Sequence, residues 1–173
     1  MRLSPIIFCA LLFAFVCPPS IADAASKRSE VPYREDSGLI TAEYYLSTGK
    51  YSQALSVIEG VINRHPLCAD AFTYRGFAYH KLGDVRRAKE NYEKAIQINP
   101  QHLGANRYLA ATYLEAGDLR RAYEQMQVIR MTCGVAACQV LDELEAEINA
   151  YRRGQRPEPV SEDPAPKPKN TYN

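Results

Sequence analysis

A pattern of residues recurs along this chain every 34 positions, and this spacing limits the folds that the chain can adopt. Gly49, Gly83 and Gly117 occupy one column of the repeat. Self-similarity at a fixed period of this length is typical of stacked helical hairpins. The repeat therefore predicts an all-α fold. Four more columns recur in the same way, one of aromatic residues, two of small residues and one of large apolar residues: Tyr45, Tyr79 and Tyr113; Ala42, Gly76 and Ala110; Ala54, Ala88 and Ala122; Ile58, Tyr92 and Met126.

Each unit of the repeat is expected to form two antiparallel helices. An amphipathic stretch runs into a glycine, which can take the left-handed conformation that ends a helix. Asp84 and Asp118 follow, where a carboxylate can cap the next helix and meet the positive end of its dipole, whereas the first unit has Lys50 there. Small residues at Gly76 and Ala88 let the two helices approach closely. A lone pair would leave its apolar stripe exposed, so the three units are expected to stack.

The third unit ends differently from the first two. Pro66 and Pro100 close the earlier units, because proline lacks the backbone donor and restricts the residue before it. Gly134 takes that place in the third unit, and beyond it an amphipathic pattern predicts one helix that covers the open end of the stack. A chain truncated at Gly134 is therefore expected to aggregate or to lose its third unit. The apolar seam comprises Ala137, Leu141, Leu144, Ile148 and Tyr151, and the acidic side comprises Asp142, Glu143, Glu145 and Glu147.

The repeated columns resemble those of the tetratricopeptide repeat family, which has small residues, a tyrosine, a glycine turn, a second pair of alanines and a closing proline. The fullest match is ADAFTYRGFAYHKLGDVRRAKENYEKAIQINP, residues 69–100, and the resemblance spans about residues 36–134. It implies a right-handed α-solenoid of three helix hairpins and a C-terminal capping helix. The domain is expected over residues 36–153, with repeats at 36–68, 69–102 and 103–134 and the capping helix at 136–153.

The first 24 residues have the layout of a cleaved secretory signal peptide: Arg2, an apolar run, and small residues before the cleavage point. The expected location is therefore the periplasm or another exported site. A retained anchor is the alternative, with a membrane contact as its consequence, although the apolar run is short of the roughly 20 residues that a span needs. A lipoprotein acylated at Cys17 is disfavoured because bulky Val16 precedes that cysteine.

The segments on either side of the repeat domain are expected to lie outside the fold, and the charge of the chain disfavours two classes of partner. Residues 25–35 are expected to be a linker, and residues 154–173, with five prolines and no apolar period, a disordered tail. The formal net charge is +1, so no strong basic field exists to attract nucleic acid or an anionic membrane surface.

Two cysteines flank the corner between the third repeat and the capping helix. Cys133 and Cys138 are separated by four residues that include a glycine, and an oxidising compartment favours a disulfide between them, worth about 2 kcal/mol by loop entropy. Small exported bacterial members of the family look similar in having such a pair. Two reduced thiols, a zinc site or a redox centre are the alternatives, and zinc is disfavoured because no second pair of ligands accompanies this one. Cys68 is expected to be a free thiol, too far from Cys133 to bond.

The inner curve of the solenoid is the candidate binding site, because in this family the first helix of each repeat lines it. Three aromatic residues in those columns are too large and too clustered for an ordinary solvated face, and aromatics are favoured at recognition surfaces. The alternative is that they pack against the next repeat or the end helix. The candidate partner-binding residues are Glu43, Tyr74, Phe77, His80, Arg107 and Tyr108.

This inner curve departs from one pattern of the family. Members that bind the C-termini of chaperones use a clamp of lysine and asparagine for the terminal carboxylate, but Leu39 and Glu43 occupy the corresponding columns here. Glu43 would repel a carboxylate, and Arg107 alone could pair with an acid. The expected ligand is therefore an extended peptide with apolar side chains, with or without one acidic group.

No motif in the sequence gives a reason to propose catalysis, a cofactor or a catalytic residue, because it has no Gly-rich phosphate loop, no HExxH and no GxSxG. His65 and His102 fall in turns between repeats, and His80 is expected to face outward. The predicted function is a non-enzymatic exported adaptor that binds a peptide segment or an envelope protein and assists assembly. A thiol-disulfide protein that cycles Cys133 and Cys138 is one alternative, disfavoured because a Cys-x-x-Cys is missing. A self-associating solenoid that forms a homodimer is the other.

Overall fold

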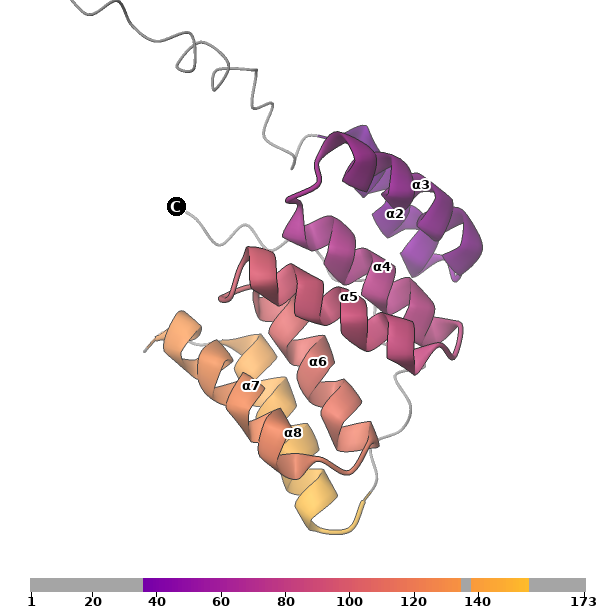
Figure 1. Ribbon diagram of the computed structural model, residues 1–173. Coiled ribbons are helices and arrows are strands. Elements are labelled where there is room, and N and C mark those ends of the chain that lie inside the picture. The colour runs from indigo at the N-terminus through magenta and orange to yellow at the C-terminus, as the bar shows by residue number, and fades with distance from the viewer. Residues whose placement is uncertain (1–35, 135–137, 156–173) are drawn as a thin grey trace, which may run out of the picture. The chain divides into compact units, whose positions relative to one another are not determined.

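The computed structural model describes residues 36–134 and 138–155, and within these ranges it contains seven helices and no strand (Figure 1). The predicted all-α class is confirmed. The predicted signal peptide 1–24, the linker 25–35 and residues 156–173 of the predicted tail lie outside the described residues. Six helices form three consecutive hairpins and the seventh follows them: α2 (Ser37–Ser47) with α3 (Tyr51–Arg64), α4 (Ala69–Lys81) with α5 (Val85–Ile98), α6 (Leu103–Glu115) with α7 (Leu119–Cys133), and then α8 (Gln139–Arg152).

A glycine with positive φ ends the first helix of every hairpin. Gly83 has φ of 81°, a left-handed conformation that other residues rarely adopt. This conformation directs the N–H of Asp84 to the carbonyl of Tyr79 at 2.9 Å, which satisfies an otherwise unpaired helix-end acceptor. Gly49 and Gly117 repeat the same geometry, with φ of 73° and 80°. The glycine column of the sequence therefore exists because the chain must reverse at the same point in each unit.

The aspartate after the glycine starts the second helix in repeats two and three. Asp84 accepts a hydrogen bond from the backbone N–H of Arg87 at 2.8 Å, and this bond, followed by that from the Arg87 side chain, lowers the pKa of Asp84. The Arg87 guanidinium also lies 4.3 Å from the ring centroid of Tyr79. The equivalent residues Asp118, Arg121 and Tyr113 repeat this arrangement. In repeat one, the side chain of Lys50 provides no such cap.

The two helices of a hairpin touch where small residues face a large apolar one. A Cβ atom added to Gly76 of α4 would lie 2.6 Å from Cε1 of Tyr92 and 3.1 Å from the carbonyl oxygen of Ala88, both on α5. Tyr92 is buried, so its ring has little room to move away. The corresponding residues of the other hairpins are also buried: Ala42, Ala54 and Ile58 in repeat one, and Ala110, Ala122 and Met126 in repeat three.

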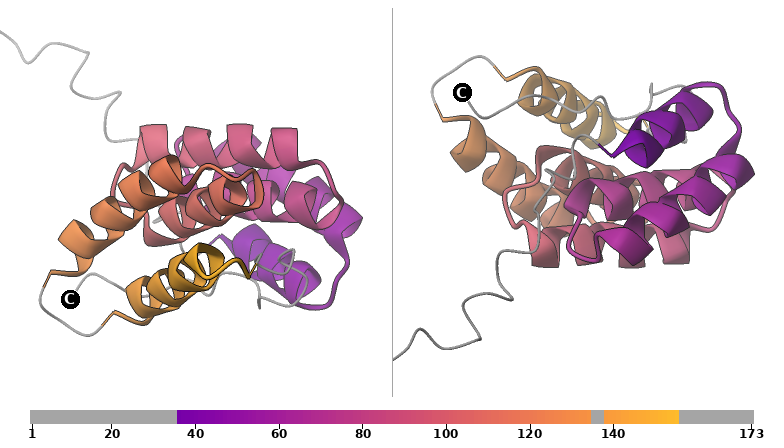
Figure 2. Two further views of the ribbon diagram at one scale, coloured as in Figure 1. Left: turned by 90° about the horizontal axis from the view of Figure 1, so that it is seen from below. Right: turned by 90° about the horizontal axis from the view of Figure 1, so that it is seen from above.

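The hairpins stack in chain order, and their first helices form one row. α2 contacts α4, α4 contacts α6, and α6 contacts α8. Both views in Figure 2 show α2 and α8 on the same side of the stack. An aromatic series ties the repeats together: the ring centroid of Phe77 lies 6.5 Å from that of Tyr51 and 5.4 Å from that of Tyr108, and Tyr108 stacks on Tyr92 at 5.6 Å. We call the side formed by α2, α4, α6 and α8 the inner face.

The helix α8 closes the C-terminal end of the stack, as the amphipathic pattern predicted. It packs against α6 and α7, and Leu144 and Ile148 are buried in the same core as the repeats. Leu141 and Tyr151 are partly buried against that core, while Ala137 lies outside the described residues. Within residues 36–134 and 138–155, no helix combines the length and the apolar character that crossing a membrane requires.

The contact between Gly76 and Tyr92 can be tested by adding one methyl group. We expect Gly76→Ala to lower the free energy of unfolding by about 1–2 kcal/mol, because overpacking costs about 1–3 kcal/mol and the gain in helix propensity returns only part of it. The measurement is urea unfolding followed by circular dichroism. Gly60→Ala in α3 is the matched control, since the nearest neighbour of its added Cβ would be the end of the Arg64 side chain at 3.4 Å. Gly60→Ala should stabilise the chain, and equal effects at both glycines would contradict the packing argument.

Candidate binding face on the first helices

The structure places most of the predicted partner-binding residues inside the stack. Phe77 is 1% exposed, Tyr74 3% and Tyr108 6%, and Arg107 is 8% exposed. Phe77 and Tyr108 belong to the aromatic series between repeats, so both make the packing contacts that were the alternative to a binding role. Glu43 of α2 is only partly buried. Their assignment to partner binding stays a prediction.

Glu43 of α2 lies near enough to Tyr74 of α4 for its charge to act on the tyrosine. Burial raises the pKa of the Tyr74 hydroxyl, and the negative charge of Glu43 raises it further. The tyrosine is therefore neutral at physiological pH and can act as a hydrogen-bond donor. The carboxylate of Glu43 gives this end of the inner face a negative charge.

Arg107 of α6 is held by two carboxylates of α8. Its Nη2 donates to Oε1 of Glu147 at 2.8 Å, and its Nε lies 3.5 Å from Oε2 of Glu143. The guanidinium also lies 5.7 Å from the ring centroid of Tyr108. The sequence placed Arg107 on the inner curve but did not predict these partners. A signal was present, because Glu143 and Glu147 are four residues apart and therefore project from one side of a helix.

Two histidine-carboxylate pairs join the second and third repeats. Nε2 of His80 lies 2.9 Å from Oε2 of Glu115, and Nε2 of His102 lies 2.9 Å from Oδ1 of Asp70. The expectation that His80 faces outward is wrong, because its side chain is 8% exposed and contacts Glu115. Each pair joins residues about one repeat apart, at sequence separations of 35 and 32. That spacing was the available signal for both pairs.

His102 also begins α6, which fixes the state of its ring. Its Nδ1 accepts a hydrogen bond from the backbone N–H of Ala105 at 3.0 Å, so the proton of the neutral ring is on Nε2 and points to Asp70. His102 is therefore both a helix cap and a contact between repeats. His65 ends α3 and lies 3.1 Å from Asp36, the residue that caps α2.

The described ranges contain no group of three or more His, Cys, Asp or Glu side chains that could hold a metal ion. The polar groups of the inner face instead pair across helices that belong to different repeats. This arrangement suits recognition, since the paired groups are fixed in place by the stack before any ligand arrives.

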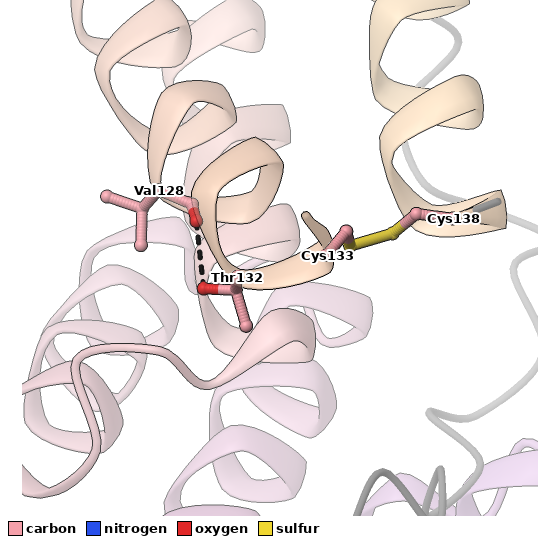
Figure 3. The surroundings of a disulfide bond; sticks show 4 residues. All are labelled: Val128, Thr132, Cys133 and Cys138. Carbon is pink, nitrogen blue, oxygen red and sulfur yellow. Dashed lines mark hydrogen bonds between the residues drawn. A yellow bond between two sulfur atoms is a disulfide. The ribbon is translucent and has the colours of Figure 1, made fainter. Parts of the chain in front are cut away.

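Cys133 and Cys138 form a disulfide that ties the end of α7 to the residue before α8 (Figure 3). Their Cα atoms are 5.9 Å apart. Thr132, next to Cys133, donates a hydrogen bond to the carbonyl of Val128 at 2.9 Å within α7. The residues 135–137 between the cysteines lie outside the described part of the chain. The bond holds the first turn of α8 close to the third repeat.

Cys68 is a free and buried cysteine. It caps α4, where its Sγ accepts a hydrogen bond from the backbone N–H of Ala71 at 3.4 Å. Burial raises the pKa of the Cys68 thiol to about 11. At neutral pH the thiol is therefore protonated and a poor nucleophile.

Comparison with known proteins agrees with this architecture. Two models of the tetratricopeptide repeat match, at residues 41–85 and 69–102. A curated relative is the Anaphase-promoting complex subunit 3 of Schizosaccharomyces pombe, which is 30% identical over 74 residues. That match covers 43% of this chain and only 11% of the relative.

Solved structures with the same fold include both free and bound domains. The chaperone SycD of Yersinia enterocolitica superposes with a TM-score of 0.64 at 13% identity, covering 78% of this chain and 92% of that one. The TPR2B domain of yeast Sti1 in its complex with pHsp70 gives 0.60 at 20% identity, covering 67% and 96%. SycD in complex with a peptide of the translocator YopD gives 0.57 at 16% identity, covering 69% and 89%.

Two models of the tetratricopeptide repeat together thus match residues 41–102. The similarity of the solved structures shows that the whole stack of helices has the all-α fold of that family. The third hairpin and α8 continue the architecture beyond the residues that the family models match.

Residues 25–173 contain three cysteines, and the number of thiols that react with a thiol reagent should differ between native, denatured and reduced protein. We expect no reactive thiol in the native protein at pH 8, because only about one Cys68 thiol in a thousand is ionised at three pH units below its pKa. Denaturant should expose one thiol, and denaturant with a reductant should expose three, as counted with a chromogenic disulfide. Cys68→Ala is the control and should leave no thiol in denaturant alone. Three thiols in denaturant without reductant would contradict the Cys133–Cys138 bond.

Proposed function

We propose that this protein is a non-enzymatic adaptor that binds a peptide segment or a partner protein on its inner face. The observation that carries the proposal is the row formed by α2, α4, α6 and α8, which places helices from three repeats and the end helix on one side. Solved structures of the same fold support it, since the Sti1 domain and SycD are each seen in a complex with a protein or peptide.

The energetics of a stacked scaffold favour recognition of an extended segment. Each repeat contributes a first helix at a regular spacing, so a ligand that lies across the row contacts several repeats at once. The scaffold is ordered in advance by the aromatic series and the two histidine-carboxylate pairs. Binding therefore costs little ordering entropy on the side of the protein.

We also propose that the protein acts after export, in the assembly of envelope proteins. The predicted signal peptide supports this location, and the disulfide between Cys133 and Cys138 is suited to an oxidising compartment. In this proposal the disulfide is a structural bond and takes no part in a reaction.

Self-association is the second candidate function. α2 exposes Ile40 and Tyr44, which are 64% and 57% exposed and stand four residues apart on one side of the helix. Two exposed apolar residues at this spacing offer a contact for a second copy of the chain. The experiment that tests the adaptor also detects this outcome.

The inner face can be tested by photo-crosslinking from a partly exposed residue. We expect p-benzoylphenylalanine in place of Glu43 to capture a partner that mass spectrometry then identifies. The matched control places the same group at Glu90 of α5, an exposed residue of a second helix that forms a surface ion pair with Arg86. Truncation of Tyr74 or Tyr108 is a poorer test, because both are buried and their loss would confuse binding with unfolding.

The outcomes separate the two candidates. A heterologous adduct from position 43 and none from position 90 supports the adaptor. A crosslinked dimer of the chain itself supports self-association. Equal capture from both positions, or capture from position 90 alone, would show that the inner face is not the binding surface.

A further inference from the structure

The inner face contains a buried cation whose two acidic partners come from α8. The Arg107 side chain is 10% exposed, whereas the side chains of Glu143 and Glu147 are 42% and 29% exposed. A cation so far from water needs an anion beside it, since an unpaired buried charge is strongly destabilising. Arg107 therefore requires a carboxylate beside it. Its burial does not decide whether that carboxylate belongs to α8 or to a ligand.

Contacts other than these two glutamates also hold α8 on the stack. Leu144 and Ile148 are buried in the common core, and the disulfide at Cys138 ties the start of the helix to α7. Glu143 and Glu147 reach Arg107 from the partly exposed side of α8, where both side chains keep some contact with water. They can turn toward water without unpacking the helix, provided that another anion takes their place.

The local charge balance also favours exchange. Two carboxylates, Glu143 and Glu147, lie within 3.5 Å of the same guanidinium. Like charges this close repel one another. Two neighbouring acids of the inner face are differently engaged, because Glu115 pairs with His80 and Asp70 pairs with His102. Arg107 is thus a cation of the inner face with more than one acid competing for it.

We propose that Glu143 and Glu147 act as an internal substitute for the ligand, and that the partner segment carries an acidic side chain that exchanges with them on Arg107. The inference rests on the proposed function, because it assumes that the partner lies on the inner face. It adds that the partner is an acidic segment and that α8 sets the affinity by competing with it. The exchange of one carboxylate for another keeps the buried arginine paired throughout.

The test measures an acidic peptide against chains with and without the internal competitor. The probe is a fluorescein-labelled octapeptide of alternating Leu and Glu, with a matched probe in which Gln replaces Glu. We expect the double variant Glu143→Gln, Glu147→Gln to bind the acidic probe about tenfold tighter than the unaltered chain, measured by fluorescence anisotropy. The Gln probe should show no difference. Adding Arg107→Gln to the double variant should abolish the gain.

A matched control and a second readout keep the result interpretable. Asp142→Asn removes an exposed acid from the same helix and should leave the affinity for the acidic probe unchanged. The acidic probe should also raise the melting temperature of the double variant more than that of the unaltered chain, since it replaces the missing carboxylates. This readout remains valid if the double variant is less stable.

Three results would overturn the inference: equal binding of the acidic probe by both chains, absence of binding to either, or a gain that survives Arg107→Gln. None of them depends on the crosslink from position 43, which reports on the inner face without involving Arg107. A crosslinked partner together with any of these results would leave the proposed function standing and remove only the exchange. If the crosslink fails but the double variant binds the acidic probe more tightly, the exchange on Arg107 stands and the proposed partner surface does not.

Discussion

Each hairpin depends on the close approach of its two helices where a small residue on the first meets a large apolar residue on the second. Gly76 against Tyr92 is one example, because a single added carbon would lie inside the contact distance of the ring. The contact sets the distance between α4 and α5, and so the distance at which the next hairpin can stack. α5 in turn contacts α6, the first helix of the next hairpin.

The sequence predicted the parts of the fold that recur in every repeat. The glycine turns and the Asp84 and Asp118 caps agree with the structure because each depends on contacts within one unit. α8 was predicted from its own amphipathic pattern, which needs no neighbour to be recognised. Features that depend on contacts within one unit can be predicted from a single sequence.

The contacts between units were harder to predict. A repeat column states where a residue lies on its own helix but not which residue of the next repeat faces it. The sequence therefore favours a binding surface for Phe77 and Tyr108, with packing as the alternative, and the structure shows that their rings are in contact. His80 was expected in solvent because its partner Glu115 belongs to the following repeat. Arg107 pairs with Glu147 of α8. This helix lies outside the 34-residue repeat, so the repeat columns do not predict which of its residues faces Arg107.

The inner face combines a fixed framework with exchangeable charge. Aromatic packing and the pairs of His80 and His102 hold the second and third repeats in register. At the C-terminal end, Glu143 and Glu147 of α8 place carboxylates beside the buried Arg107. Apolar residues and the disulfide hold α8 in position. A surface built in this way can remain folded while its charges change partners, which is what recognition by an adaptor requires.

The account depends most on α8 being part of the same folded unit as the third repeat. Hydrogen exchange followed by mass spectrometry on chain 25–173 measures this directly, because amides in one cooperative unit open together. The account predicts that the amides of α8 exchange as slowly as those of α6 and α7, since Leu144 and Ile148 are buried in the shared core. Exchange of α8 at the rate of an unstructured peptide, with α6 and α7 still protected, would contradict it.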